Sequence, residues 1–323
     1  MKNLILLAVF LFLTTVINAQ SLFGPANTMG FGQIGVVASG NNYQSAYFQN
    51  PALLGRKQHE FDVFVNYNQA SQLTNISSVT AGGMLTFKGN NAFGLGLDRL
   101  SLGNSQNTTF NITTIPLLYA RNLYQSDWAG ISVGANFNLI NHRGDGSGFG
   151  VSNINASSIS GGLGLDAYRV LSLSDNQFLR FNIAASTNNI GEDINDNNGY
   201  VVTVNDLTQV GTMVSWKYVL SSLESINFNL AYQLAGSFGR VSNIKNHHVG
   251  LEGRYTLEEQ SIYAALRIGA IWSQFYYGTD YQYMTFGGTV NIKGFYVDFA
   301  VLPESLNGLN NVNIGFGYQK FLN

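Results

Sequence analysis

The segment ISVGANFNL, residues 131–139, decides the fold of this chain. Apolar residues fall on every second position of it: Ile131, Val133, Ala135, Phe137 and Leu139. Between them stand the small or polar residues Ser132, Gly134, Asn136 and Asn138. Successive side chains of a β-strand point to opposite faces, so this period of two predicts a strand with one apolar and one polar face.

The same alternation recurs from His59 to the end of the chain. We count about fourteen alternating segments, and turn-forming residues separate most of them. Their centres lie near residues 64, 80, 96, 114, 133, 163, 183, 213, 230, 251, 266, 287, 298 and 316. Two longer stretches, 141–158 and 188–206, are rich in Asn, Gly and Ser, and we expect them to be exposed outer loops.

Strands of this kind favour a membrane-spanning barrel. A strand that crosses a bilayer needs about 9–11 residues, and the alternating segments reach that length. Unpaired backbone groups are costly in hydrocarbon, so a sheet enters a membrane only when it closes on itself. The sequence therefore predicts an all-β fold, a transmembrane antiparallel β-barrel of about 14 strands over residues 58–323. A soluble sandwich or propeller is the alternative, but it would carry more charge on its wet faces.

The composition agrees with a wall between lipid and water. Charged residues make up only 11% of the chain, beside 36 Gly, 17 Tyr and 22 Phe. The formal net charge of −2 argues against nucleic acid as a partner, and the lack of cysteine excludes disulfides and thiol chemistry. Aromatic residues near the expected strand ends predict girdles at the two membrane interfaces: Phe61, Tyr119, Trp128, Trp216, Trp272, Tyr276 and Phe321.

The first residues have the pattern of a secretory signal. A short basic head, Met1 to Asn3, precedes the apolar run Leu4 to Val16, and Ala19 offers a small residue for cleavage before Gln20. We therefore expect residues 1–19 to be a signal peptide and the mature protein to reside in the outer membrane.

The glycines that follow suggest a nucleotide site, but their surroundings do not. Gly30, Gly32 and Gly35 match the G-x-G-x-x-G fingerprint, which requires a strand before the first glycine and a helix after the last. Pro25 and its neighbours form no apolar run, and the breakers Ser39 to Asn42 come too soon for a helix. We expect no cofactor.

Residues 20–57 lack the strand pattern and are predicted to plug the barrel. A cylinder of this strand number is wider than its own side chains can fill, so something must block it if it is not an open pore. Residues 43–48 are expected to form a turn or two of helix that ends at Asn50 and Pro51, because the residue before a proline is pushed out of helical geometry.

Residues 29–36 together with YQSAYFQNPA, residues 43–52, resemble the start of the FadL superfamily of outer-membrane barrels. Within that superfamily the stretch is most similar to the PorV-like (LptO) branch of the type IX secretion system of Bacteroidota. The residues that carry the plug motif are Tyr47, Phe48, Asn50, Pro51 and Ala52. RLSLG at 99–103 and GFYVDFA at 294–300 add weaker likeness to later parts of the family.

The resemblance implies a barrel that handles secreted cargo with C-terminal signal domains, with a secretion translocon and cargo proteins as partners. The alternative is a FadL-like transporter of hydrophobic small molecules, for which a lipid or fatty acid is the ligand and Pro116 marks a strand kink. A structural barrel that supports gliding or surface attachment is a third reading. In the first reading Tyr276, Tyr277 and Tyr281 are rim contacts on an outer loop, although girdle aromatics would look the same.

Other candidate sites are weak. His247 and His248 are neighbours on an expected strand and should point to opposite faces, so we predict no metal site. Two charge pairs, Asp98–Arg99 and Glu252–Arg254, are expected at the lumen or the rim. The chain has no nucleophile elbow and no cysteine, and its four histidines lack acidic partners at matching positions, so we do not expect an enzyme.

Overall fold

The computed structural model describes residues 49–56, 59–70, 76–87, 90–103, 109–145, 154–191, 194–195, 201–202, 207–236, 245–257, 261–274, 281–302 and 311–321. The expected signal peptide and the plug residues Tyr47 and Phe48 lie outside these ranges. Within them, no helix has the length and apolar character needed to cross a membrane.

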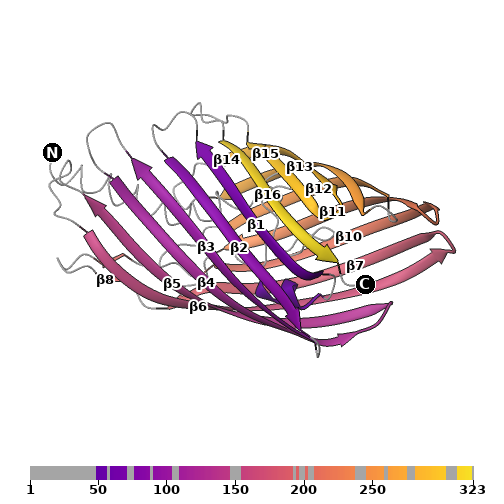
Figure 1. Cartoon of the computed structure of the whole chain (residues 1–323), viewed down its shortest axis with the longest axis horizontal. Helices are drawn as coiled ribbons and strands as arrows, with labels where there is room; N and C mark the ends of the chain where they lie inside the picture. Colours follow the sequence, from indigo (N-terminus) through magenta and orange to yellow (C-terminus); the bar gives the residue numbers. More distant parts are fainter. Residues whose placement is uncertain are drawn as a thin grey trace.

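The chain forms a closed antiparallel β-barrel of 14 strands (Figure 1). The strands are β1 (His59–Ala70), β2 (Ile76–Phe87), β3 (Asn91–Gly103), β4 (Thr109–Gln125), β5 (Ala129–Asp145), β6 (Ile154–Ser174), β7 (Gln177–Gly191), β10 (Leu207–Ser221), β11 (Glu224–Gly236), β12 (Lys245–Leu257), β13 (Ile262–Gln274), β14 (Tyr281–Ile292), β15 (Phe295–Leu302) and β16 (Asn311–Phe321). Each strand pairs with its neighbour in sequence, and β1 pairs with β16 to close the cylinder. A separate two-stranded sheet is formed by β8 (Ile194–Asn195) and β9 (Val201–Val202), which come between β7 and β10 in the sequence.

The two ends of the barrel differ in their connections. At the end that holds the start of β1 and the end of β16, successive strands are joined by short turns such as Asp175–Asn176 and Lys293–Gly294. Both turn residues of the second have positive φ, 53° and 93°, as the tight hairpin turn requires, and this explains the glycine. The opposite end carries the longer connections, such as that between Gly191 and Leu207. In outer-membrane barrels short turns face the periplasm, so we assign the long-connection end to the cell exterior.

The outer and inner faces are chemically opposite. Large apolar side chains alternate along the strands and stay exposed on the outside, as Leu95, Phe137, Leu163, Leu266 and Phe316 do. The polar side chains on the alternate positions are buried inside: examples are Asn66, Asn138, Asn182, Gln233, Thr285 and Asn313. A closed cylinder with an apolar exterior and no free sheet edge is an outer-membrane barrel.

The expected loops at 141–158 and 188–206 are shorter than predicted. β5 continues to Asp145, β6 begins at Ile154, and β7 continues to Gly191. β6 is the longest strand, with 21 residues. The sequence prediction was wrong here because it used apolar alternation to find strands. At this end the outward-facing residues are polar, for example Asn141, Arg143 and Ser157, while strand pairing goes on.

Candidate functional site

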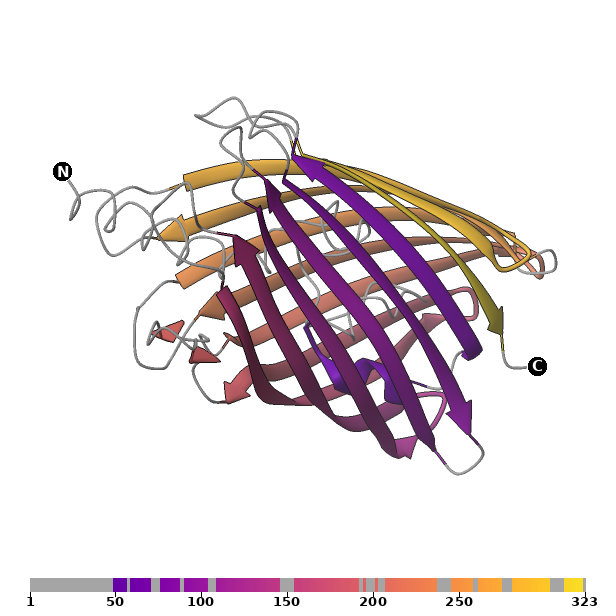
Figure 2. The same ribbon diagram turned by 60° about the vertical axis from the view of Figure 1, so that its left-hand side comes forward.

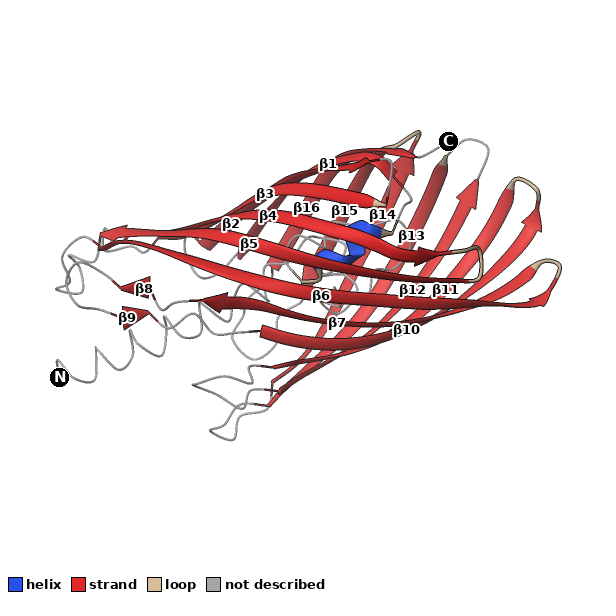
Figure 3. Ribbon diagram, turned by 90° about the horizontal axis from the view of Figure 1, so that it is seen from below, coloured by secondary structure: helices blue, strands red, loops and turns tan. Residues whose placement is uncertain are grey.

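Residues Gln49–Arg56, which we call the inner segment, lie inside the barrel (Figure 2). They pack against β3, β4, β5 and β6, and Figure 3 shows their short helix enclosed by the strands. The helix is a 3-10 helix, η1 (Pro51–Gly55). Asn50 caps its start: the backbone of Asn50 is extended, and its Oδ1 accepts a hydrogen bond of 3.1 Å from the Ala52 N–H.

Asn50 and Pro51 therefore begin a helix, and the prediction that they end one was wrong. Proline is favoured in the first turn, where its missing N–H has no intrahelical partner anyway. The helix expected at 43–48 lies outside the described residues.

Two asparagines tie the start of the inner segment to the wall. Asn50 Nδ2 donates to the Leu165 carbonyl on β6 at 3.2 Å. Asn188 Nδ2 on β7 donates to the Gln49 carbonyl at 2.7 Å, and its Oδ1 accepts from Asn136 Nδ2 on β5 at 3.1 Å. At this point two β7 residues, Asn188 and Asn189, stand opposite Gly162 alone, which is a β-bulge, and Asn189 has a φ of 60°. The bulge thus lies where the wall meets the inner segment.

A buried ion pair holds the other end. Arg56 Nε donates to Asp166 Oδ2 at 2.7 Å, and Arg56 Nη2 donates to Asp166 Oδ1 at 2.5 Å. The two side chains are 4% and 1% exposed, so the pair is shielded from water. A bidentate arginine–carboxylate contact fixes direction as well as distance. The inner segment is therefore joined to β6 at both Asn50 and Arg56.

Glycines in the wall let the inner segment come this close. A Cβ on Gly134 of β5 would stand 2.5 Å from the Ala52 nitrogen and 2.5 Å from the Pro51 carbonyl carbon. A Cβ on Gly164 of β6 would collide with Asn50 Oδ1. Gly134 needs hydrogen as a side chain because it meets the backbone of the inner segment, and Gly164 needs it because it meets the capping side chain of Asn50.

The apolar side of η1 covers an apolar patch of the lumen wall. Leu53 and Leu54 are at most 1% exposed. They cluster with Phe64 of β1, Met84 of β2, Ala92 of β3, Leu118 and Ala120 of β4, and Tyr296 of β15. We call these six wall residues the lumenal apolar patch.

The wall beside this patch has an interrupted ladder. β3 and β4 pair from Asn91 to Leu95 and again from Asp98 onward, but Gly96 and Leu97 have no partner on β4. Opposite them stands Pro116, which lacks the N–H that a ladder needs. The β4–β5 ladder continues through Pro116 without a break, so the interruption affects one seam only.

The wall opposite the inner segment carries a charge network. Arg267 Nε donates to Glu252 Oε2 at 2.6 Å, and its Nη1 donates to Thr289 Oγ1 at 2.7 Å and lies 3.7 Å from Asp298 Oδ1. Arg254 Nη2 also donates to Glu252, at 3.1 Å. Every charge in this network has an opposite partner, so it rigidifies the lumen without giving it a net sign.

No protein-family model and no curated protein sequence matches this chain. Solved structures do match. The toluene transporter TbuX of Ralstonia pickettii aligns with a TM-score of 0.50 and 15% identity over 93% of this chain and 98% of its own. The monoaromatic hydrocarbon channel CymD aligns at 0.52 with 11% identity over 93% and 97%. The toluene transporter TodX of Pseudomonas putida aligns at 0.50 with 12% identity over 92% and 97%.

The fold is that of the FadL-type barrels. At these identities the likeness concerns the fold. The resemblance found in the sequence is confirmed at that level, and the PorV-like branch stays a prediction.

The structure places the other predicted residues as follows. Tyr276 and Tyr277 lie outside the described residues, and Tyr281 starts β14 at the long-connection end, where its backbone pairs with Ser273. Glu252 and Arg254 form the expected lumenal pair.

Two predictions about neighbouring residues had different outcomes. Asp98 and Arg99 do not form a pair, because they point to opposite faces: Asp98 accepts from Thr80 Oγ1 at 3.0 Å, and Arg99 donates outside to Asn111. His247 and His248 do lie on opposite faces, with His247 bonded to the Tyr232 hydroxyl and His248 buried. In the described ranges no group of three or more metal-ligating side chains of the kind His, Asp or Glu is assembled.

Arg56, Asp166 and Asn188 were missed by the sequence analysis. Arg56 lies a few residues after Ala52, the last residue of the plug motif, and this nearness was the one available signal. Asp166 and Asn188 are more than 100 residues away in the chain, and only closure of the barrel brings them to the inner segment.

Proposed function

We propose that this barrel passes hydrophobic small molecules across the outer membrane. The observation that carries the proposal is the lumenal apolar patch beneath Leu53 and Leu54. Polar side chains line most of the described lumen, so an apolar patch there is a place where a hydrophobic solute can leave water. The inner segment occupies that place, and a solute must displace it or enter beside it.

The interrupted seam gives such a solute an exit. Leu118 of the patch is the next inward-facing residue after Pro116 on β4. Backbone pairing is what seals a barrel wall, and Gly96 and Leu97 lack it toward β4. A solute at the patch therefore lies beside an interruption in the backbone pairing of the wall. The solved structures of similar fold include two toluene transporters and a monoaromatic hydrocarbon channel, and this supports the proposal.

Uptake by intact cells tests the proposal. The barrel is expressed in a Gram-negative host whose own hydrophobic-solute channels are deleted, and uptake of labelled toluene and labelled long-chain fatty acid is measured. We expect faster uptake of at least one of them than in cells with an empty vector. Equal uptake by both strains, at verified surface levels of folded barrel, would overturn the proposal.

A type IX secretion component remains the second candidate, because residues 29–36 and 43–52 resemble the PorV-like branch. In that case the partners are a secretion translocon and cargo with C-terminal signal domains. Deletion in the native organism separates the two functions. Cargo retained inside the cells with normal hydrocarbon uptake would support secretion, and normal secretion with slower uptake would support transport.

A further inference from the structure

The outer wall carries a polar surface near the long-connection ends of β3 to β6. Cross-strand pairing arranges it in rows. One row holds Arg99, Thr113, Asn141 and Ser157, and the row beyond it holds Ser101, Asn111, Arg143 and Asn155. The row below them is apolar, with Ile115, Leu139 and Ile159 exposed to the membrane. We call the two polar rows the outer polar surface.

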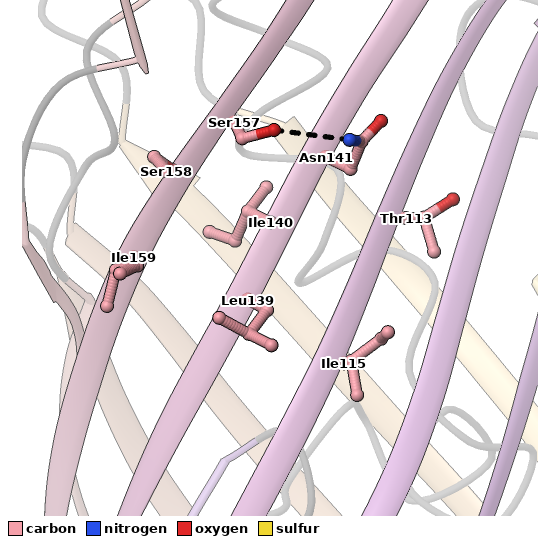
Figure 4. A pocket seen from close by; sticks show the side chains of 8 residues that line it. All are labelled: Thr113, Ile115, Leu139, Ile140, Asn141, Ser157, Ser158 and Ile159. Carbon is pink, nitrogen blue, oxygen red and sulfur yellow. Dashed lines mark hydrogen bonds between the residues drawn. The ribbon is translucent and has the colours of Figure 1, made fainter.

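A depression of about 450 Å³ lies where the apolar row meets the first polar row (Figure 4). Ile115, Leu139 and Ile159 line its lower part. Along its upper edge Asn141 Nδ2 donates to Ser157 Oγ at 3.2 Å, and Thr113 lies beside them. The depression thus has an apolar floor for hydrocarbon and a polar edge for a headgroup.

The outer polar surface is positively charged. It contains Arg99 and Arg143 and no acidic side chain. The two arginines stand on β3 and β5, on either side of β4 and one row apart, and strand geometry puts their backbones about 12 Å apart. Arg99 Nη2 makes only a long hydrogen bond, to Asn111 Oδ1 at 3.4 Å, so its guanidinium can also bind an anion. Among the described side chains these are the only cations that face outward at this end.

We propose that the outer polar surface binds a phosphorylated glycolipid of the lipid A type from the outer leaflet. The guanidinium groups of Arg99 and Arg143 bind its phosphates, the hydroxyl and amide groups of Thr113 and Asn141 bind the sugar, and an acyl chain lies in the depression. Arginine is well suited to phosphate because its planar donors match two phosphate oxygens. The position of the outer polar surface along the barrel axis fits a lipid of the outer leaflet. The surface lies at the long-connection end, which faces the cell exterior, where the glycolipid headgroups are.

Lipid titration by native mass spectrometry tests the inference. The purified, delipidated full-length barrel is titrated with diphosphoryl lipid A, with dephosphorylated lipid A, with phosphatidylglycerol and with inorganic phosphate. The test variant is Arg99→Gln/Arg143→Gln. The matched control is Arg121→Gln/Arg169→Gln, because Arg121 and Arg169 are exposed on the outer face of β4 and β6 at the short-turn end. Heat-dependent electrophoretic mobility confirms that each variant is folded.

We expect the wild-type barrel and the control each to retain one diphosphoryl lipid A. In the test variant the affinity for diphosphoryl lipid A should fall by about tenfold or more. Ile159→Trp, which fills the depression, should also weaken binding while leaving both arginines in place. Three results would each overturn the inference: equal affinity in the test variant, an equal loss in the control, or phosphatidylglycerol or inorganic phosphate bound as tightly as lipid A.

Discussion

Asp166 is the inward-facing residue of β6 that receives the guanidinium of Arg56. Both are buried, and a buried charge without its partner is costly. Asp166→Asn should therefore destabilise the seat of the inner segment by about 3 kcal/mol or more. We expect higher ion conductance in planar bilayers, because the segment leaves the lumen more often.

Lys320→Gln is the matched control for that measurement. Lys320 Nζ and Glu60 Oε2 are also 2.7 Å apart, but their side chains are 56% and 49% exposed, so water replaces the lost contact. Conductance should stay at the wild-type level in this control. Equal conductance in both variants would show that the Arg56–Asp166 pair does not hold the inner segment.

Gly164 offers a second test at the level of one residue. Gly164→Ala places a methyl group on Asn50 Oδ1 and should displace the start of the inner segment. Gly253→Ala adds the same methyl group where the nearest atom, on Phe228, is 3.6 Å away, and should be neutral. Protease protection of the N-terminal region in outer-membrane vesicles reports the difference. Unchanged protection in Gly164→Ala would contradict the close approach.

At the level of elements, the strand count was predictable and the strand limits were not. All fourteen predicted centres fall within observed strands, because the lipid face repeats every second residue. The predicted strand limits were wrong where the outward-facing side chains are polar, as at Asn141 and Ser157. There the backbone pairing continues, but the apolar signal that marks a strand has ended. The short pair β8 and β9 also gave no periodic signal, because each has only two residues.

The seam between β3 and β4 yields a prediction about transport. Pro116→Ala restores an N–H opposite Gly96, so the ladder should close and hydrophobic uptake should slow by about tenfold. Thr114→Ala, two residues away on the same face, leaves the N–H pattern unchanged and serves as the control. Uptake is measured in the channel-deficient host described above. If Pro116→Ala transports as fast as the wild type, the exit lies elsewhere.

At the level of the whole molecule, barrel closure assembles the candidate site. Asn50, Pro51 and Ala52 were recognisable from the sequence, because the motif is continuous. Their partners on β5, β6 and β7 come from distant segments whose register only the closed sheet fixes. The charge network shows the same effect, since the Glu252–Arg254 spacing predicted a pair, but its link to Arg267 on β13 needed the register of two strands.

The central claim is that the inner segment sits inside the barrel against β5, and a disulfide tests it most directly. The chain has no cysteine, so an engineered pair reacts alone. A Cβ on Gly55 would lie 2.7 Å from the Ser132 Cβ, close enough for a bond after a small shift. We predict that Gly55→Cys/Ser132→Cys cross-links on mild oxidation of intact outer membranes, and that Gly55→Cys/Ser225→Cys, with the second cysteine on β11, does not. Cross-linking to position 225 and none to position 132 would contradict the account.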